Sequence, residues 1–253
     1  MTDLILNIST LGAHSNFKGQ GFKQKDLRFL AELFTNWVDV FLSPEIPSWH
    51  NTQALRHLEK LNKKGWAHSQ GTGKQKRYTL TRIGLLEIVH SISDNNGYAD
   101  IRYTLLSYYF IRAYRKRIMS LIEAEGSGFS KAVQMEILHL FDEKQFLLNQ
   151  INELDQQIKR LEIRVDETNK AFNLALKLNN SGEKVDDIIN SISKLHPYEL
   201  ENQKPMGELL KEIDPEQRLW EATEGNRHRA DILWQTQLNV LKDHRKHLKS
   251  FIS

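Results

Sequence analysis

The sequence predicts a mainly α-helical protein that carries one small β-hairpin near its N-terminus and an all-α region after it. Three observations predict this class. Apolar residues recur at intervals of three or four positions over much of the chain of 253 residues, as on one face of a helix. A basic segment, residues 66–80, has two β-prone pieces on either side of a Gly-rich tip, as a hairpin does. A heptad repeat runs from Ile137 to Ala175, which is typical of a coiled-coil helix.

The chain divides into an N-terminal arm and two predicted domains. Residues 1–24 contain three glycines close to two lysines and are expected to form a flexible arm. Residues 25–95 are expected to form the first domain. A polar break at residues 95–97 then leads into a helical domain that spans residues 96–253.

Two helices are predicted at the start of the first domain, over residues 25–35 and 37–42. The apolar residues here have helical spacing, and the polar pair Thr35 and Asn36 interrupts it. Two prolines then break the chain before the next helix begins.

The next helix is predicted to span about four turns before Gly65. Ser48 or Asn51 is expected to cap its start, because a short side-chain oxygen satisfies backbone donors there, and Gly65 is expected to end it. One face of this helix is polar and basic, and the other carries Ala54, Leu55, Leu58 and Leu61.

A β-hairpin is predicted directly after this helix. Residues 66–69 and 77–80 form its two strands, and the tip between them is rich in Gly and Lys. Thr81 is expected to cap the following helix, in which Gly84 allows another backbone segment to approach closely.

This order of helix, hairpin and helix resembles the winged helix-turn-helix of bacterial transcriptional regulators. The stretches TQALRHLEKLNKKGW and KRYTLTRIGL are most similar to the PadR-type regulators, in which a similar helix, an LxxLxxxGW turn and a YxLTxxG junction recur. The resemblance covers about 70 of the 253 residues. It implies a DNA-binding domain in which the helix before Gly65 is the recognition helix and the hairpin is the wing.

The distribution of charge favours double-stranded DNA as the partner of the first half of the chain. Residues 1–120 hold 17 Lys and Arg against 9 Asp and Glu, whereas residues 121–253 hold 18 against 23. A basic surface binds duplex DNA by displacing counterions condensed on the phosphates. The acidic second half is an unsuitable DNA surface.

The candidate DNA-binding residues lie on the polar face of the predicted recognition helix and on the wing. Those on the helix are expected to face the major groove, where Arg pairs with guanine and Gln with adenine. Those on the wing are expected to hold phosphate or to reach the minor groove. A merely solvated polar face is the alternative. The candidates are Thr52, Gln53, Arg56, His57, Lys60, Lys74, Lys76 and Arg77.

The helical domain is predicted to begin with an aromatic and basic helix, residues 101–122. Its aromatic residues are expected to serve core and dimer packing, with a pocket for an aromatic or cationic small-molecule effector, or contact with the DNA backbone, as alternatives. A coiled-coil helix follows at about residues 130–179. The last helix, about residues 214–252, repeats the same apolar spacing and is expected to fold back on the coil as an antiparallel hairpin.

A homodimer is predicted from the heptad seam of the coiled-coil helix. β-branched residues at the first seam position and Leu at the second favour two strands. The flanking charges do not form attractive pairs between two copies, which implies a further partner helix. The residues expected to form the dimer contact are Ile137, Leu140, Leu147, Ile151, Leu154, Ile158 and Leu161.

The composition gives little support to thiol chemistry, to enzyme activity or to a membrane-spanning protein. The chain has no Cys, which excludes disulfides, thiolate metal sites and a Cys nucleophile. We identify no catalytic residues, no metal site and no cofactor motif, and we expect no enzyme activity. No apolar run approaches the roughly 18 residues that a membrane span needs. A cytoplasmic protein is expected.

Two functions therefore remain open from the sequence. In the first, the protein is a homodimeric, sequence-specific transcriptional regulator, most simply a repressor, that binds double-stranded DNA. In the second, the winged helix is a protein-interaction subunit of a chromosome-organising or replication complex, and the coiled coil docks a partner chain. The polar, basic recognition face favours the first.

Overall fold

The computed structural model describes residues 2–40, 49–94, 101–194 and 219–252. It is mainly helical and contains two compact units. Unit 1 comprises Met1–Glu153 and Leu248–Ser253, and unit 2 comprises Leu154–His247. Among the described residues, no helix is both long and apolar enough to cross a membrane.

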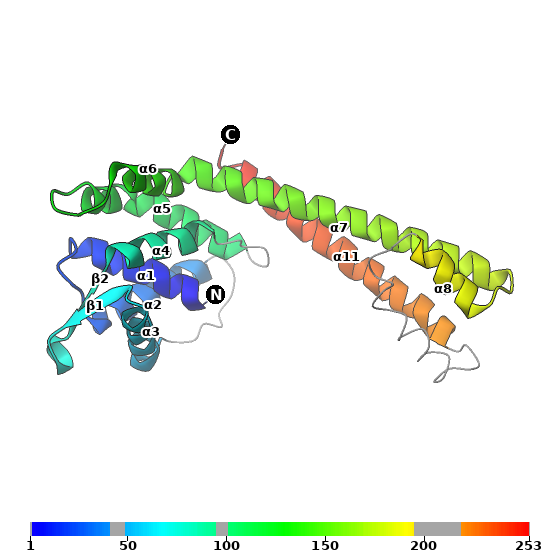
Figure 1. Ribbon diagram of the computed structural model, residues 1–253, viewed down its shortest axis with the longest axis horizontal. Coiled ribbons are helices and arrows are strands. Elements are labelled where there is room, and N and C mark those ends of the chain that lie inside the picture. The colour runs from blue at the N-terminus through cyan, green and yellow to red at the C-terminus, as the bar shows by residue number, and fades with distance from the viewer. Residues whose placement is uncertain (1, 41–48, 95–100, 195–218, 253) are drawn as a thin grey trace. The chain divides into compact units, whose positions relative to one another are not determined.

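Unit 1 contains the predicted hairpin and the helices around it (Figure 1). Its elements are α1 (Thr2–Asn16), α2 (Gln24–Val40), α3 (Asn51–Lys63), β1 (Ala67–Gln70), the 3₁₀ turn η1 (Gly73–Gln75), β2 (Arg77–Leu80), α4 (Arg82–Ser93), α5 (Ile101–Ile122) and α6 (Lys131–Leu140). The long helix α7 (Glu143–Asn180) begins in unit 1 and continues into unit 2, which also contains α8 (Val185–Ser193) and most of α11 (Leu219–Lys249).

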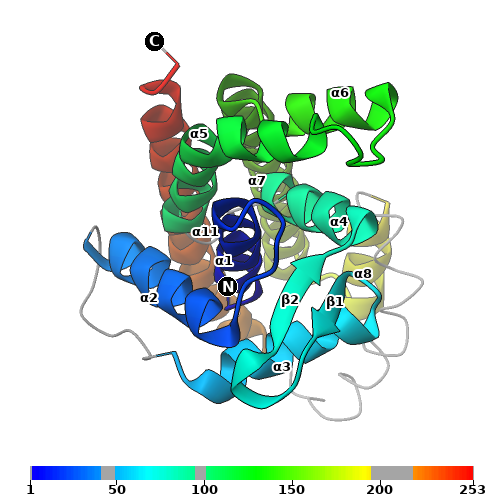
Figure 2. The ribbon, with the colours of Figure 1, turned by 90° about the vertical axis from the view of Figure 1, so that its left-hand side faces the viewer.

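The predicted flexible arm is wrong, because residues 2–16 form the central helix of unit 1. Figure 2 shows α1 surrounded by α2, α4 and α5, and its apolar side chains are buried. The hydroxyls of Ser9 and Thr10 are buried too, but they donate to the carbonyls of Ile5 and Leu6 one turn earlier. These polar residues are therefore satisfied within the helix, and a buried helix can contain them.

The two helices predicted over residues 25–35 and 37–42 are instead one helix, α2, as far as the described residues extend. Thr35 does not interrupt it. The Thr35 hydroxyl accepts a hydrogen bond of 2.6 Å from the Trp49 indole nitrogen and is buried. A polar residue in this apolar stripe thus marks a tertiary contact rather than a helix end.

The antiparallel hairpin is confirmed. Ala67 of β1 pairs with Leu80 of β2, and Gln70 pairs with Arg77. An isolated bridge between Phe22 and Tyr78 joins the segment before α2 to the outer edge of β2. The core beneath the hairpin draws on several elements and consists of Ala13, Phe22, Leu27, Leu30, Ala54, Leu58 and Tyr78, with Phe34 packed against it.

The domain boundary predicted near residue 95 does not divide the compact units. α5 and α6 belong to unit 1 with α1–α4. The ring of Phe110 on α5 meets the ring of Phe34 on α2 at 5.8 Å between centroids. The aromatic residues of α5 thus contribute to the core of unit 1, as expected for one of their predicted roles.

The coiled-coil helix predicted at about residues 130–179 is interrupted after Leu140. Phe141 is buried between α6 and α7, and the Asp142 carboxylate accepts from the Gln145 backbone nitrogen at 2.9 Å, which caps α7. That hydrogen bond, assisted by Arg115 at 2.7 Å, lowers the pKa of Asp142. Ile137 and Leu140 therefore lie on a different helix from the other seam residues, so the predicted continuous seam is wrong at its start.

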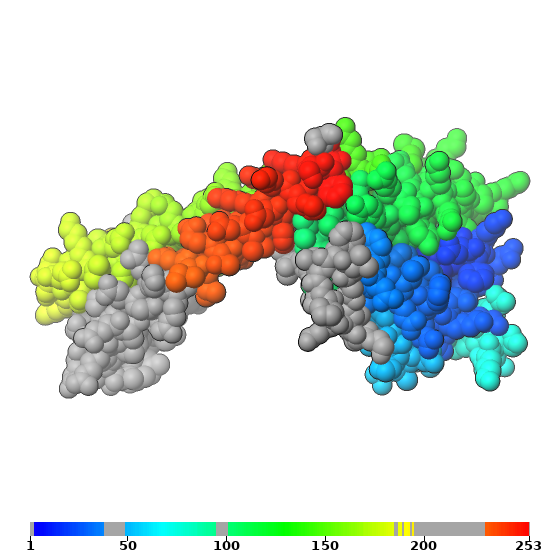
Figure 3. Space-filling view, turned by 180° about the vertical axis from the view of Figure 1, so that it is seen from behind, coloured from blue at the N-terminus to red at the C-terminus, as the bar shows by residue number. Residues whose placement is uncertain are grey.

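In unit 2, α7 and α11 lie antiparallel, as the orange and yellow-green surfaces of Figure 3 show. Asp155 pairs with Arg245 at 2.6 Å and Glu162 pairs with Lys242 at 2.7 Å, so the residue numbers rise along one helix as they fall along the other. In the predicted dimer of two parallel α7 helices, Asp155 and Glu162 would have no basic partners. The chain's own α11 provides basic partners for them.

The seam residues of α7 are covered within a single chain. Leu147, Ile151, Leu154 and Ile158 are buried, and Leu161 is half-buried, without any second copy. A homodimer formed by these residues stays a prediction, and it would require this packing to open.

Leu154→Asp is expected to destabilise unit 2 rather than to dissociate a dimer. Leu154 is only 6% exposed within the chain, so the new carboxylate would be buried without a partner, at a cost of about 3 kcal/mol or more. Urea unfolding followed by circular dichroism measures the loss, and light scattering measures the mass. Ile163→Asp is the matched control on the same helix, because Ile163 is 47% exposed. A stable Leu154→Asp variant with half the mass of the wild type would instead identify the seam as a dimer interface.

Candidate nucleic-acid interface

Helix α3 separates an apolar inner face from a polar outer face. Ala54, Leu58 and Leu61 pack into the core, which leaves the opposite side exposed. The exposed predicted residues are Thr52, Arg56 and Lys60, and Lys63 continues the same face one turn later. Lys60 forms an exposed ion pair with Asp3 at 3.5 Å, which stabilises little and leaves the ammonium accessible.

The start of α3 is capped differently from the prediction. His50 is the N-cap residue, Asn51 is the first residue of the helix, and Ser48 lies outside the described residues. The Gln53 side-chain oxygen accepts a 2.9 Å hydrogen bond from the His50 backbone nitrogen. A bidentate contact between Gln53 and adenine uses both the oxygen and the nitrogen of the amide, so it would compete with this bond for the amide oxygen.

His57 is not on the outer face of α3, so its predicted position in the major groove is wrong. The side chain is 6% exposed, and its Nε2 lies 3.1 Å from the Thr10 hydroxyl of α1. The Thr10 hydroxyl donates its only proton to Leu6, so it accepts from His57. Burial lowers the pKa of His57 to about 4, which keeps the ring neutral. His57 belongs to the same helical stripe as Ala54, Leu58 and Leu61, and this spacing was the signal for its burial.

The wing presents three basic side chains. Lys74 is exposed in the tip, and within the described residues it forms no ion pair. The Lys76 ammonium lies over the Tyr78 ring, 5.2 Å from its centroid. Arg77 is exposed and donates from Nη1 to the Gly21 carbonyl at 3.1 Å, so one edge of its guanidinium is held and the rest is accessible. In Figure 3 the wing, in cyan, stands out from the surface of unit 1.

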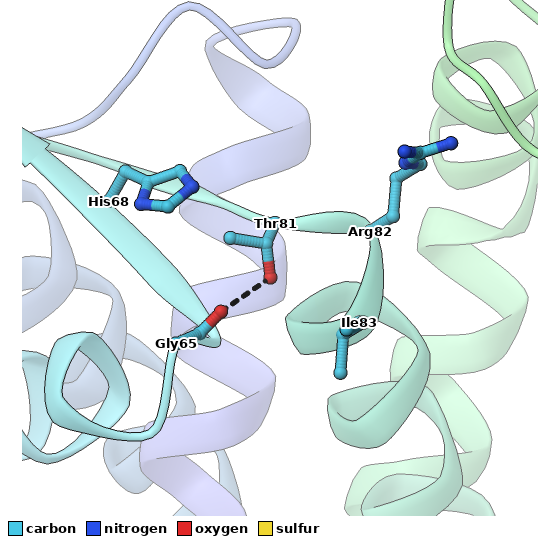
Figure 4. A pocket seen from close by; sticks show the side chains of 5 residues that line it. All are labelled: Gly65, His68, Thr81, Arg82 and Ile83. Carbon is cyan, nitrogen blue, oxygen red and sulfur yellow. Dashed lines mark hydrogen bonds between the residues drawn. The ribbon is translucent and has the colours of Figure 1, made fainter.

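The base of the wing is fastened to the end of α3. The Thr81 hydroxyl donates to the Gly65 carbonyl at 2.9 Å, as Figure 4 shows, and accepts from the Gly84 nitrogen at 3.0 Å. The Thr81 backbone nitrogen donates to the Trp66 carbonyl at 2.9 Å. These bonds connect α3, the hairpin and α4, and they set the position of the wing relative to the recognition helix.

A pocket of about 460 Å³ opens beside this base. It is lined by Gly65, His68, Thr81, Arg82 and Ile83. In Figure 4 the Arg82 side chain points away from Thr81, and its Nη1 donates to the Gly128 carbonyl at 2.6 Å. Arg82 thus serves to hold the segment before α6, and the pocket adds no basic group to the wing.

Sequence reasoning missed a basic contribution from the start of α2. The Lys23 ammonium donates to Gln75 in the wing at 3.2 Å, and Arg28 donates to the Asn51 side chain at the start of α3 at 3.2 Å. Lys25, between them in the sequence, is exposed. The signal was the presence of three basic residues in one short segment, which the prediction divided between an arm and a helix.

The exposed surface formed by α3, the start of α2 and the wing is strongly basic. Asp26 is an acid within this surface. Its carboxylate accepts a hydrogen bond from the Lys23 backbone nitrogen at 2.8 Å. Glu32 pairs with Arg28 at 3.4 Å, and Glu59 is exposed on α3. The basic residues of this surface are Lys23, Lys25, Arg28, Arg56, Lys60, Lys63, Lys64, Lys74, Lys76 and Arg77.

Comparison of the chain with protein-family models, with curated proteins and with solved structures finds no match. Across the residues that the structure describes, no group of three or more His, Asp or Glu is arranged to hold a metal ion. The chemistry of this surface therefore has to be inferred from its own geometry and charge.

Proposed function

We propose that unit 1 is a winged helix-turn-helix domain that binds double-stranded DNA, and that the protein is a sequence-specific transcriptional regulator. The observation that carries the proposal is the joining of three basic elements into one surface. Lys23 connects the start of α2 to the wing, and Arg28 connects it to the start of α3. The order of α1, bridge, α2, α3 and hairpin supports the winged-helix assignment.

In this proposal α3 enters the major groove with its exposed side chains. Arg56 is the best candidate for reading a base, because it is exposed and forms no ion pair among the described residues, and Arg can contact guanine with two hydrogen bonds. Lys60 and Lys63 lie further along the same face and suit phosphate contacts. Lys74, Lys76 and Arg77 of the wing suit phosphate or the minor groove.

A homodimer that represses transcription remains part of the proposal. A two-fold pair would read two half-sites related by symmetry. Since the predicted seam residues are covered within one chain, the dimer contact has to use another surface or a rearranged hairpin.

The second candidate function, docking of a partner protein, is favoured by a different feature. Phe29 and Leu33 lie one turn apart on α2, and they are 63% and 51% exposed. Such side chains on a helix surface are typical of protein contacts. This apolar pair is on α2 and not on the outer face of α3, so the DNA surface and a protein contact are compatible.

Arg56→Ala is expected to remove discrimination at one base position, at a cost of about 1–3 kcal/mol for the preferred base. Lys76→Ala is expected to weaken binding to all sequences alike, because a phosphate contact carries no sequence information. Binding constants for the preferred site and its single-base variants measure both effects. Lys131→Ala, an exposed basic residue on α6, is the control and should leave binding unchanged. Equal losses on every sequence for Arg56→Ala would contradict base reading by α3.

The proposed function itself is tested by binding to a random pool of duplex DNA over a series of salt concentrations. Sequencing of the DNA that remains bound at high salt is expected to show an enriched motif, and a two-fold symmetric motif bound by two chains would support the dimer. Steep salt dependence without enrichment would indicate nonspecific binding. No binding at all would contradict the proposal and favour the docking of a protein.

A further inference from the structure

An open surface pocket of about 820 Å³, called the cavity below, lies in unit 1 where the end of α1 meets the last turns of α5. None of its lining residues belongs to the proposed DNA surface. They come from the segment that ends α1, from the second half of α5 and from the bend just after it, and they are Ser15, Asn16, Lys18, Arg117, Ser120, Leu121 and Ala124.

The lining of this cavity is positively charged. Lys18 and Arg117 contribute two cations, and no lining residue is an acid. Neither cation forms an ion pair with a carboxylate in the part of the chain that the structure describes. Leu121 and Ala124 add an apolar wall beside the charges. A positive site with an apolar wall is complementary to an organic anion.

Arg117 is held in position before any ligand binds. Its Nη1 donates to the Asn16 side-chain oxygen at 2.6 Å, and its guanidinium carbon lies 5.3 Å from the centroid of the Tyr114 ring. The other guanidinium donors are left for a ligand. A preoriented guanidinium loses less conformational freedom on binding an anion, because its geometry already matches a phosphate or carboxylate.

Lys18 occupies a special backbone position. Its φ is +49°, in the left-handed region, and Gly19 after it is at +75°. The turn is fixed by hydrogen bonds from the Lys18 nitrogen to the Ser15 carbonyl at 3.1 Å and from the Gly19 nitrogen to the His14 carbonyl at 3.0 Å. Glycine or asparagine would adopt this conformation more readily than lysine, so the backbone alone does not account for a lysine here.

We propose that this cavity binds a small organic anion, with a phosphate or carboxylate group held by Lys18 and Arg117 and an apolar part against Leu121 and Ala124. The chain just after Lys18 contacts the wing through Gly21 and Phe22. Arg77 donates to the Gly21 carbonyl, and Phe22 bridges to Tyr78. A ligand that draws Lys18 toward α5 therefore acts on the wing through a few residues of chain. This regulatory step rests on the proposed DNA binding, whereas the anion site does not.

Titration of the full chain with phenyl phosphate, followed by calorimetry at constant ionic strength set with chloride, tests the site. Wild-type protein is expected to bind, and both Lys18→Asn and Arg117→Gln are expected to bind at least about tenfold more weakly, since each loses a charge-assisted contact. Lys18→Asn suits the left-handed backbone and is the safer variant for folding. Lys116→Gln, an exposed neighbour on α5 outside the lining, is the matched control and should bind as the wild type does. Absence of binding by the wild type, or equal binding by all variants, overturns the proposal.

A second titration separates the anion site from DNA binding. Saturating phenyl phosphate is expected to change the DNA affinity of the wild type by about tenfold and that of Lys18→Asn by much less. If phenyl phosphate binds but DNA does not, the anion site stands and the proposed function fails. If both cavity variants weaken DNA binding while the wild type binds no phenyl phosphate, Lys18 and Arg117 contact DNA phosphates, and the anion site is overturned.

Discussion

Unit 1 is expected to lose much of its stability between pH 6.5 and pH 4, because the unfolded chain then binds protons at two histidines that burial keeps neutral in the folded chain. Burial lowers the pKa of both His14 and His57 to about 4, from an ordinary value of 6.5. Above pH 6.5 both rings are neutral in the folded and the unfolded chain, so they do not favour either state. Below that pH the unfolded chain binds protons that the folded chain excludes. The free energy of unfolding therefore falls as the pH falls, by about 3 kcal/mol for each histidine once pH 4 is passed.

The hydrogen bonds of the two rings show how protonation would affect the proposed DNA surface. The His14 Nδ1 accepts from the Leu80 backbone nitrogen at 3.4 Å, and protonation would remove this acceptor. That bond joins α1 to β2 of the wing. His57 joins α1 to α3 through Thr10. Two of the three elements of the proposed DNA surface, the wing and α3, are thus attached to α1 by a neutral imidazole.

Urea unfolding at about pH 7.5 and about pH 4.5 measures this effect. His14→Asn retains an acceptor near the position of Nδ1, and His57→Gln retains a donor near the position of Nε2, but neither replacement titrates. The double variant is expected to lose several kcal/mol less than the wild type between the two pH values. His68→Gln is the control, since His68 is exposed on β1. A double variant with the same pH dependence as the wild type would show that other groups control acid unfolding.

The hairpin, the helix before it and the role of Gly84 could be predicted because their determinants are local. Gly-rich tip residues, alternation along the strands and one apolar helix face lie within a few residues of one another in the sequence. The charge of the wing could be predicted for the same reason. The basic start of α2 could not be assigned to that surface, because Lys23 and Gln75 are far apart in the chain and meet only in the fold.

The errors arose where a polar residue in an apolar pattern is satisfied by a tertiary or backbone contact. The polar pair Thr35 and Asn36 predicts a break, yet Thr35 is buried with a hydrogen-bond partner within one continuous helix. His57 was assigned to DNA by its residue type, although its place in the apolar stripe put it in the core. The heptad pattern correctly predicts that one face of α7 is apolar. It does not predict whether a second copy or the chain's own α11 covers that face. Lys242 pairs with Glu162 and Arg245 pairs with Asp155, which lies 90 residues earlier, and these pairs identify α11 as the neighbour.

Gly84→Ala is expected to destabilise unit 1, although the same exchange in an exposed helix usually stabilises by about 1 kcal/mol. A Cβ at this position would overlap the carbonyl group of Trp66 and lie 2.7 Å from its Cα. These are backbone atoms, so no side-chain rotation can relieve the overlap. The Trp66 carbonyl also accepts from the Thr81 nitrogen, so moving α4 away strains the bond that starts that helix. The cost of such overpacking is typically about 1–3 kcal/mol, and the strained hydrogen bond adds to it.

Urea unfolding and DNA binding of Gly84→Ala together test whether the base of the wing sets its position. Glu87→Ala is the matched control, because Glu87 is exposed on the same helix and its replacement should change neither quantity appreciably. If Gly84→Ala is as stable as the wild type, α4 does not pack on Trp66 as closely as the structure has it. Gly84 is buried and cannot touch DNA, so a loss of DNA affinity in a sample that is still folded must come from a shift of the wing relative to α3. Unchanged affinity in that sample would mean that the wing contributes little to binding, and α3 with the start of α2 would then carry the interface.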